Sequence, residues 1–356
     1  MRQQASQRDP VVLAVASASP PHRIAQSELR GFARRFFAGN FPAIDRLLPA
    51  FDNSGIGERQ MASPIEWFDA PHSFVEKNAV YCRCALDMAR EAGARALQQA
   101  GVAADEVAAL VFVSTTGIAT PSLDSYLVQL LGMSRATARV PLWGLGCAGG
   151  AAGLARAADL VRALGRPVLL IASEVCSATF VHGDRSKSNL IATALFGDGA
   201  AAVVLAPGSD DAAGLRLLGS HTQLLDDTAG VMGWMLEAEG LRVRFARSIP
   251  EIVRKTVPGF CNAAAELTGI ALAEVEHYVV HPGGAKVLGA YEAALAVPRE
   301  RIETAYQVLR AHGNMSSPTV LFVLERFMRD TPPTGAPGLV LGLGPGFAAE
   351  GVVFRW

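Results

Sequence analysis

The sequence predicts an α/β protein built from two similar layered halves. Short, wholly apolar runs alternate along the chain with longer segments that carry apolar residues at helical spacing. Apolar runs without polar alternation are typical of strands in a sheet that helices cover on both faces. A looser stretch at residues 207–213 divides the chain, so we expect an N-terminal half over residues 1–207 and a C-terminal half over 208–356.

The first half contains four predicted strands and three predicted helices. The strands are residues 11–16, 108–114, 168–175 and 200–205, and the helices are residues 84–100, 123–131 and 148–164. Gly101 and Gly165 directly follow two of these helices. Because glycine adopts a left-handed backbone at little cost, both are well suited to end a helix.

The second half repeats this rhythm. Its predicted helices are residues 249–267, 285–295 and 315–328, and its predicted strands are residues 275–280, 339–343 and 352–356. In each half a polar residue stands at a helix start and an apolar strand follows; the residue is Cys147 in the first half and Asn314 in the second. The repeated order suggests a duplicated fold with one site between the halves.

Charge and hydropathy exclude several classes of function. The 356 residues carry 32 basic and 33 acidic side chains without a basic block, so we expect no nucleic-acid partner. No apolar run approaches the roughly 18 residues of a membrane helix, so we expect no membrane span. The polar start, residues 1–10, lacks the apolar core of a signal peptide, which predicts a cytoplasmic protein.

The five cysteines do not resemble a disulfide framework, because their number is odd and the chain is long. Only Cys82 and Cys84 lie close together, and no second pair follows them to complete a structural zinc site. We therefore expect no metal site, and we expect most of the cysteines to be small buried hydrophobic residues.

Cys147 lies in the most unusual stretch of the chain, residues 144–150 (GLGCAGG). Backbone N–H groups and the helix dipole stabilise a thiolate at a helix start, so we expect a nucleophile with a lowered pKa. Two alternatives remain open. The stretch contains the dinucleotide pattern G-x-G-x-x-G, with Glu174 as the nearest acidic residue, and a structural cysteine in a tight helix–sheet contact would need the same small neighbours.

His281 and Asn314 are the other candidates for chemistry. His281 ends a predicted strand and precedes Pro-Gly-Gly, which places it well to project into a cleft. Asn314 precedes a predicted helix, where asparagine is ordinarily an N-cap, and a lone histidine is ordinarily structural. Together with Cys147, they would supply a nucleophile, a group that polarises a carbonyl and a neutral amide donor.

Five motifs resemble those of the type III polyketide synthases, the chalcone synthase-like branch of the thiolase superfamily. The motifs are residues 146–150 (GCAGG), 196–201 (FGDGAA), 281–284 (HPGG), 313–317 (GNMSS) and 342–346 (GLGPG). The resemblance spans nearly the whole chain and implies the thiolase fold, with duplicated αβαβα halves. The related ketoacyl-ACP synthases III usually continue their histidine motif with Gln-Ala-Asn rather than Pro-Gly-Gly.

The resemblance implies a mechanism. Cys147 takes the starter acyl group from CoA, while His281 and Asn314 hold the thioester carbonyl of malonyl-CoA and stabilise the enolate formed on decarboxylation. The enolate attacks the Cys147 thioester, the cycle repeats, and the poly-β-keto chain cyclises. The substrates are acyl-CoA and malonyl-CoA, and no cofactor or metal is required because decarboxylation supplies the carbanion.

The resemblance also assigns the walls of the substrate site. Phe196 matches the family's gatekeeper phenylalanine, and Val243 stands where plant members have a second one. Thr115, Ala119 and Cys176 resemble bacterial members that thread a fatty acyl chain through a tunnel. The remaining expected substrate contacts are Trp234 near the elongation cavity, Ser316 and Gly344 in the shared motifs, and Arg59 as a basic contact to CoA.

These features predict an enzyme that makes an alkylpyrone or alkylresorcinol from a medium- or long-chain fatty acyl-CoA starter. Thr120 stands where plant members send a methionine across a dimer interface, so we expect a homodimer. Alternatives are a tetrahydroxynaphthalene or phloroglucinol synthase that uses malonyl-CoA alone, a ketoacyl synthase that stops after one condensation, and a non-catalytic partner protein of the same fold.

Overall fold

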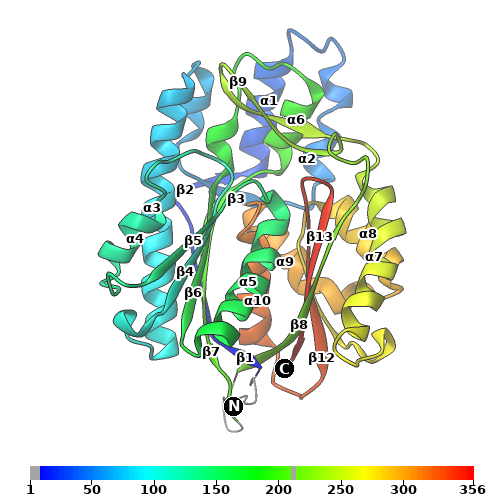
Figure 1. Cartoon of the computed structure of the whole chain (residues 1–356). Helices are drawn as coiled ribbons and strands as arrows, with labels where there is room; N and C mark the ends of the chain where they lie inside the picture. The colour runs from blue at the N-terminus through cyan, green and yellow to red at the C-terminus, as the bar shows by residue number, and fades with distance from the viewer. Residues whose placement is uncertain (1–8, 210–213) are drawn as a thin grey trace.

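The computed structural model describes residues 9–209 and 214–356, which form five stacked layers (Figure 1). Helix α3 (Phe74–Ala100) covers the outer face of the N-terminal strands, and α7 (Ile249–Glu266) and α8 (Ala285–Leu295) cover the outer face of the C-terminal strands. Helices α5 (Gly149–Leu164) and α10 (Thr319–Asp330) lie between the two sets of strands. This is the layered α/β arrangement that the sequence predicts.

The strands join in one nine-stranded sheet in the order β11-β12-β13-β8-β1-β7-β6-β4-β5. Their bounds are β1 (Pro10–Ala18), β4 (Ala109–Val113), β5 (Ala138–Leu142), β6 (Val168–Val175), β7 (Asp198–Pro207), β8 (Leu215–Leu224), β11 (His277–Val280), β12 (Pro337–Gly344) and β13 (Ala348–Arg355). The halves meet at a short pairing of β1 with β8, where Val11 and Val12 face Arg216 and Leu215.

Both halves use the same pairing pattern. In the first, β1 pairs antiparallel with β7, β7 antiparallel with β6, and β6 parallel with β4. In the second, β8, β13, β12 and β11 repeat these three pairings in the same order. The helices α5 and α10 occupy equivalent places, each directly before the strand that continues its half. The functional motifs therefore meet where the two central helices begin.

The predicted strands and most predicted helices are confirmed. Gly101 and Gly165 end α3 and α5 with left-handed φ angles of 63° and 62°. Helix α3 begins at Phe74 rather than at residue 84, and Ser73 and Glu76 form its capping box. The helix predicted from residue 315 begins at Thr319, because the left-handed φ of 62° at Ser316 interrupts any helical path there.

A further group of elements stands over one end of the layers, and we call it the cap. It consists of α1 (Gln26–Phe37), β2 (His22–Ala25), α2 (Pro49–Asp52), β3 (Glu58–Met61), α6 (Lys187–Leu195) and the hairpin of β9 (Met232–Glu237) with β10 (Gly240–Phe245). Figure 1 shows most of these elements at the top of the molecule. The prediction missed the cap, because its segments are short and polar or lack a sustained apolar period.

Two shorter α-helices, α4 (Asp124–Leu130) and α9 (Glu303–His312), belong to neither the central layer nor the cap. No helix within residues 9–209 and 214–356 is long and apolar enough to span a membrane. Residues 1–8 of the polar start and residues 210–213 of the dividing stretch lie outside the described residues.

Candidate active site

Cys147 lies in a 3-10 turn, Gly146–Ala148, that leads into α5. The turn needs glycine at position 146, where φ is 49° and a Cβ would lie 2.8 Å from Pro345. Its backbone is tied to the first half by Gly146 N, which donates to Thr115 Oγ1 at 3.2 Å. The Cys147 side chain is buried, with 8% of its surface exposed. The thiol therefore faces an enclosed site rather than open solvent.

Asn314, which belongs to the second half of the chain, lies beside this thiol. Its side-chain Oδ1 and Nδ2 both lie 3.8 Å from Cys147 Sγ. Oδ1 accepts a hydrogen bond from Ser316 N at 2.8 Å, and Nδ2 donates to Gly283 O at 3.4 Å. These two contacts fix the direction of the amide. Because the helix starts at Thr319, Asn314 is not an N-cap, and that interpretation is wrong.

His281 enters from the end of β11, where its backbone N donates to Leu341 O at 2.8 Å. Its imidazole is buried, and neither ring nitrogen has a hydrogen-bond partner among the described residues. Buried polar atoms are rarely left unpaired, so an unpaired imidazole points to a ligand or a transferred proton. Asn314 bonds to Gly283, two residues after His281, so the segment that carries His281 lies beside the amide that contacts the thiol.

Burial shifts the pKa values of Cys147 and His281, and both shifts favour the neutral form. Burial raises the pKa of the Cys147 thiol to about 11, although hydrogen bonds from Ser316 and Asn314 oppose the rise. Burial lowers the pKa of His281 to about 3. The resting site therefore holds a thiol and a neutral imidazole. The lowered thiol pKa that we expected at a helix start is wrong, because desolvation outweighs the hydrogen bonds that favour the thiolate.

The dinucleotide interpretation of residues 144–150 is not supported. A Cβ at Gly149 would lie 2.7 Å from the Val113 side chain, and one at Gly150 would lie 2.3 Å from Ser317 O. The glycines thus let α5 approach β4 and the Asn314 loop, and they leave no room for a pyrophosphate. Glu174, the acidic residue of that pattern, is buried against protein donors and cannot reach a ribose.

Glu174 is a central polar residue whose role the sequence did not predict. Its carboxylate accepts hydrogen bonds from the backbone N of Thr115 and Thr116, both at 2.9 Å, and from Thr116 Oγ1 at 2.7 Å. Its other oxygen accepts from Ser317 Oγ at 2.7 Å. Glu174 thereby joins the loop that holds Gly146 to the loop that carries Asn314. Its burial raises its own pKa.

A cluster of aromatic side chains stands beside the site. The ring centroid of Phe196 lies 5.4 Å from Trp234 and 5.6 Å from Phe245. Val243 faces Trp234 in the register of the β9–β10 hairpin and packs in the same cluster. Phe245, two residues after Val243 on the same face of the strand, supplies the second aromatic contact, and the sequence analysis did not identify it.

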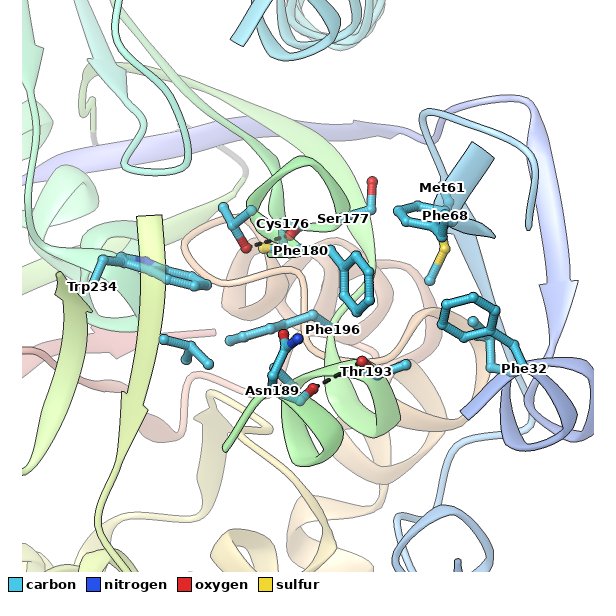
Figure 2. A pocket seen from close by; sticks show the side chains of 14 residues that line it. Phe32, Met61, Phe68, Cys176, Ser177, Phe180, Asn189, Thr193, Phe196 and Trp234 are labelled. Atoms are coloured by element: carbon cyan, nitrogen blue, oxygen red, sulfur yellow. Dashed lines mark hydrogen bonds between the residues drawn. The ribbon is translucent and has the colours of Figure 1, made fainter. Parts of the chain in front are cut away.

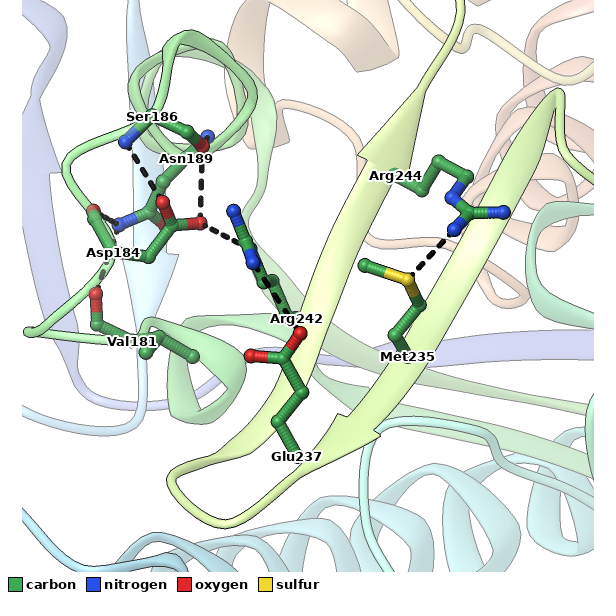
Figure 3. Close-up of polar contacts among 8 residues, drawn as sticks. All are labelled: Val181, Asp184, Ser186, Asn189, Met235, Glu237, Arg242 and Arg244. Atoms are coloured by element: carbon green, nitrogen blue, oxygen red, sulfur yellow. Dashed lines mark hydrogen bonds and ion pairs between the residues drawn. The ribbon is translucent and has the colours of Figure 1, made fainter.

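Polar contacts fasten this hairpin to the rest of the cap (Figure 3). Arg242 Nε lies 3.1 Å from Asp184 Oδ2, and Arg242 Nη1 lies 3.3 Å from Glu237 Oε1. Asp184 also accepts hydrogen bonds from Ser186 N and Oγ, at the start of α6. The hairpin that carries Trp234 and Val243 is therefore linked to the helix that ends at Phe196.

A pocket opens beside this aromatic cluster (Figure 2). Four expected substrate residues line it, namely Cys176, Phe196, Trp234 and Val243. Thr115 and Ala119 do not line it. Thr115 Oγ1 accepts from Gly146 N, and Ala119 packs in the cluster under α3. Of the three residues expected in the fatty acyl tunnel, this pocket therefore includes Cys176.

The expectation that Arg59 contacts CoA is wrong, because its side chain is completely buried. Its guanidinium donates to Thr193 O and Phe196 O, both at 2.8 Å, and to Gln26 Oε1. Burial lowers its pKa to about 9, partly offset by the charge of Asp198. Arg59 holds the end of α6 in place and has no donor directed to solvent.

Ser316 and Gly344 lie close to Cys147, and a hydrogen bond from Ser316 to the thiol opposes the rise of its pKa. Ser316 is buried, and its carbonyl accepts from Thr319 N and Oγ1. A Cβ at Gly344 would lie 2.4 Å from Leu145 O, so this glycine lets the β12–β13 turn form the wall behind the Cys147 turn. Thr120 lies exposed just before α4.

Comparison with known proteins decides the family. Residues 1–210 match the family described as chalcone and stilbene synthases, N-terminal domain, and residues 216–356 match the C-terminal domain of the same family. The chain belongs to the chalcone and stilbene synthases. A 1,3,6,8-tetrahydroxynaphthalene synthase of Streptomyces peucetius subsp. caesius is 40% identical to this synthase over 357 residues, covering 97% of this chain and 93% of that protein.

Solved structures confirm the thiolase fold of the synthase. The 1,3,6,8-tetrahydroxynaphthalene synthase of Streptomyces coelicolor A3(2) matches with a TM-score of 0.92 at 29% identity, covering 97% of this chain and 99% of that one. PKS-I of the brown alga Ectocarpus siliculosus matches with a TM-score of 0.91 at 25% identity, covering 99% and 100%. This synthase is a type III polyketide synthase, an acyltransferase that uses acyl-CoA and malonyl-CoA.

Proposed function

We propose that the synthase extends a medium- or long-chain fatty acyl-CoA starter with malonyl-CoA and cyclises the product to an alkylpyrone or alkylresorcinol. The observation that carries this proposal is the apolar pocket that begins at Phe196. The backbone of Phe196 is bridged to Asn314, so the pocket starts next to the reacting groups. A pocket with aromatic and aliphatic walls favours a hydrocarbon chain over a polar starter.

Loading is the first step of the proposed mechanism. Cys147 Sγ attacks the thioester carbonyl of the acyl-CoA while the imidazole of His281, neutral at rest, accepts the thiol proton. The tetrahedral intermediate collapses, the C–S bond to CoA breaks, and the departing CoA sulfur takes that proton. The acyl group is then held as a thioester on Cys147, and the imidazole is neutral again.

Extension follows. A protonated ring nitrogen of His281 and Nδ2 of Asn314 donate to the thioester oxygen of malonyl-CoA, which develops negative charge as CO₂ leaves. The resulting enolate carbon attacks the acyl thioester, and Cys147 sulfur departs. The chain is now two carbons longer and is attached to CoA, from which Cys147 can take it again. The electrons for the new bond come from the bond broken to CO₂, so we propose that neither a redox cofactor nor a metal takes part.

A second candidate is the synthesis of tetrahydroxynaphthalene or phloroglucinol from malonyl-CoA alone. Two observations favour it: the relative from Streptomyces peucetius bears the name tetrahydroxynaphthalene synthase, and Trp234 stands beside Phe196 where it narrows the cavity. A ketoacyl synthase that stops after one condensation is a third candidate. The number of malonyl units in the product separates all three.

We also propose that the synthase works as a homodimer in the cytoplasm. A group of large apolar side chains is exposed near α4 and the edge strand β5, namely Ile118, Tyr126, Leu130 and Trp143. Together with the open edge of β5, this face has the composition of a subunit interface. All five cysteines are free thiols, which supports a reducing compartment.

Mass spectrometry of the products tests the proposal. Purified synthase is incubated with isotope-labelled malonyl-CoA and starters of two to twenty carbons. Triketide or tetraketide pyrones and resorcinols from the longer starters support the proposed function. A labelled aromatic product from malonyl-CoA alone supports the second candidate. A single β-ketoacyl product, or no product with any starter, overturns the iterative mechanism.

A further inference from the structure

The pocket begins beside the active site, at Phe196, whose backbone is bridged to Asn314, and extends into the cap. Figure 2 shows Trp234 at one end, Cys176 and Phe196 in the middle, and Phe32, Met61 and Phe68 at the other end. The far end is built by α1, β3 and the segment Ile65–Asp69, none of which carries a motif of the catalytic site.

Three phenylalanines form the far end of the pocket. The ring centroids of Phe32 and Phe68 are 6.4 Å apart, those of Phe32 and Phe180 are 5.9 Å apart, and those of Phe68 and Phe180 are 5.8 Å apart. All three pairs meet edge to face, which is a favourable arrangement of aromatic rings. The three rings therefore form a packed apolar wall, which we call the phenylalanine wall.

The hydroxyl and amide side chains that line the pocket have their donors already engaged. Ser177 Oγ donates to Asp198, Thr179 Oγ1 donates to Cys176 O, and Thr193 Oγ1 donates to Asn189 O. Asn189 Nδ2 donates to the carbonyls of Val181 and Asp184. A ligand in the pocket finds no free side-chain donor in this set, so these residues favour a hydrocarbon over a hydroxylated or charged group.

The phenylalanine wall is fixed from behind. Lys77 Nζ, on α3, donates to Phe180 O at 3.2 Å. The guanidinium of Arg185 stacks 3.4 Å over the ring of Phe36, which in turn packs against Phe32 and Phe180. Lengthening the pocket beyond the wall requires these contacts to break. The wall therefore limits the length of an acyl chain in the pocket, and it cannot move to fit a longer chain unless these contacts break.

We infer that the pocket binds the hydrocarbon end of the starter acyl chain and that Phe32, Phe68 and Phe180 set the longest chain that fits. This inference rests on the proposed function, because it assumes that Cys147 is loaded with a fatty acyl group. It names the route of the chain, past Cys176 and Ala192 toward α1, in place of the expected route past Ala119. The ligand class is a saturated or monounsaturated acyl chain.

Acyl loading measured by intact-protein mass spectrometry tests the inference. The occupancy of Cys147 is followed over time with acyl-CoA starters of six to twenty carbons and without malonyl-CoA. Phe180→Ala removes part of the wall and should move the optimum to longer chains. Ala192→Leu adds atoms to the middle of the pocket and should move it to shorter ones. Each methylene of the starter that no longer fits should lower loading efficiency roughly fourfold, because the free energy gained by burying that methylene is lost.

Phe41→Ala is the matched control. Phe41 is a partly buried phenylalanine that packs against the same hydrophobic cluster but does not line the pocket. Its loading profile should equal that of the wild type. If Phe180→Ala does not fold, Ala192→Leu still tests the inference, because it shortens the pocket without opening the cap.

The outcomes separate this inference from the proposed function. If the wild type loads long chains and both pocket variants keep its chain-length profile, the phenylalanine wall does not set length and the inference is wrong. If the wild type loads no fatty acyl group but condenses malonyl-CoA alone, the proposed starter is wrong and the inference falls with it. If the optimal chain length rises in Phe180→Ala and falls in Ala192→Leu, the result supports both the inference and the proposed function.

Discussion

The backbone of Phe196 is bridged to that of Asn314, so the first wall of the pocket and the amide beside the nucleophile are held as one unit. Gly197 N donates to Asn314 O at 3.0 Å, and Asn314 N donates to Leu195 O at 2.9 Å. Arg59 adds a hydrogen bond to Phe196 O from inside the cap. The position of the pocket is therefore coupled to the chemistry at Cys147 through backbone contacts rather than through mobile side chains.

Replacement of Asn314 should separate the two half-reactions. In Asn314→Ala, the amide that would donate to the malonyl thioester oxygen is lost, while Cys147 and His281 remain. Decarboxylation of malonyl-CoA should fall by about 100-fold or more, as is typical when one oxyanion donor is removed. Loading of Cys147 should fall less. The two rates are measured by CO₂ release and by intact mass, and an equal loss in both would contradict the assigned role.

Glu174→Gln tests whether Glu174 positions the two catalytic loops. The amide would turn an N–H₂ toward donors that now point at the carboxylate, which we expect to cost about 1–3 kcal/mol of stability. The kcat of condensation should fall with little change in the KM for malonyl-CoA. Glu350→Gln is the control, a buried carboxylate on β13 that bonds to Thr222. If both variants change kcat equally, Glu174 has no specific role.

His281 should make the fold sensitive to acid. Its pKa is about 3 in the folded state against 6.5 when exposed, so the unfolded chain binds more protons between these values. Stability should therefore fall as pH falls below 6.5, and this group alone should remove roughly 2 kcal/mol between pH 7 and pH 5.

The free energy of unfolding, measured by denaturant titration at both pH values, checks the contribution of His281. His281→Asn should reduce the loss between pH 7 and pH 5 by about that amount. An identical pH dependence in the variant would show that the imidazole is not held neutral by burial.

Arg242→Ala should loosen the hairpin that carries Trp234 and Val243. The residue is partly exposed, so its ion pair with Asp184 should contribute less than about 1 kcal/mol to stability. We expect a larger share of shortened products, because the wall of the elongation cavity is less firmly held. Arg244→Ala is the control, since Arg244 contacts Met235 within the hairpin and has no ion pair among the described residues (Figure 3). Equal product profiles in the two variants would exclude a role for the Asp184 contact.

The sequence predicted those features that depend on local pattern. The glycine-capped helices, the apolar strands and the glycine turn around Cys147 all follow from short-range preferences, and they proved correct. The start of α10 was predicted too early, because nothing in the local sequence reveals that Ser316 adopts a left-handed backbone. The convergence of His281 and Asn314 on the thiol came from the order of motifs and from the family resemblance.

The remaining features depend on contacts between distant segments. The burial of Arg59 follows from its acceptors on α6, more than a hundred positions further along the chain. The direction of the pocket follows from the way α1 and Phe68 pack against Phe180, and no motif marks those residues. Alternation of Leu241, Val243 and Phe245 along β10 was a readable signal for the second aromatic side chain, but it required the register of the hairpin.

The covalent role of Cys147 is the central claim, and the most direct test compares the wild type with Cys147→Ala by intact-protein mass spectrometry and product analysis. Both proteins are incubated with a fatty acyl-CoA and isotope-labelled malonyl-CoA. The wild type should carry the acyl mass on Cys147 and release a labelled, cyclised polyketide, and the variant should do neither. An appreciable yield of labelled polyketide from Cys147→Ala would contradict the account.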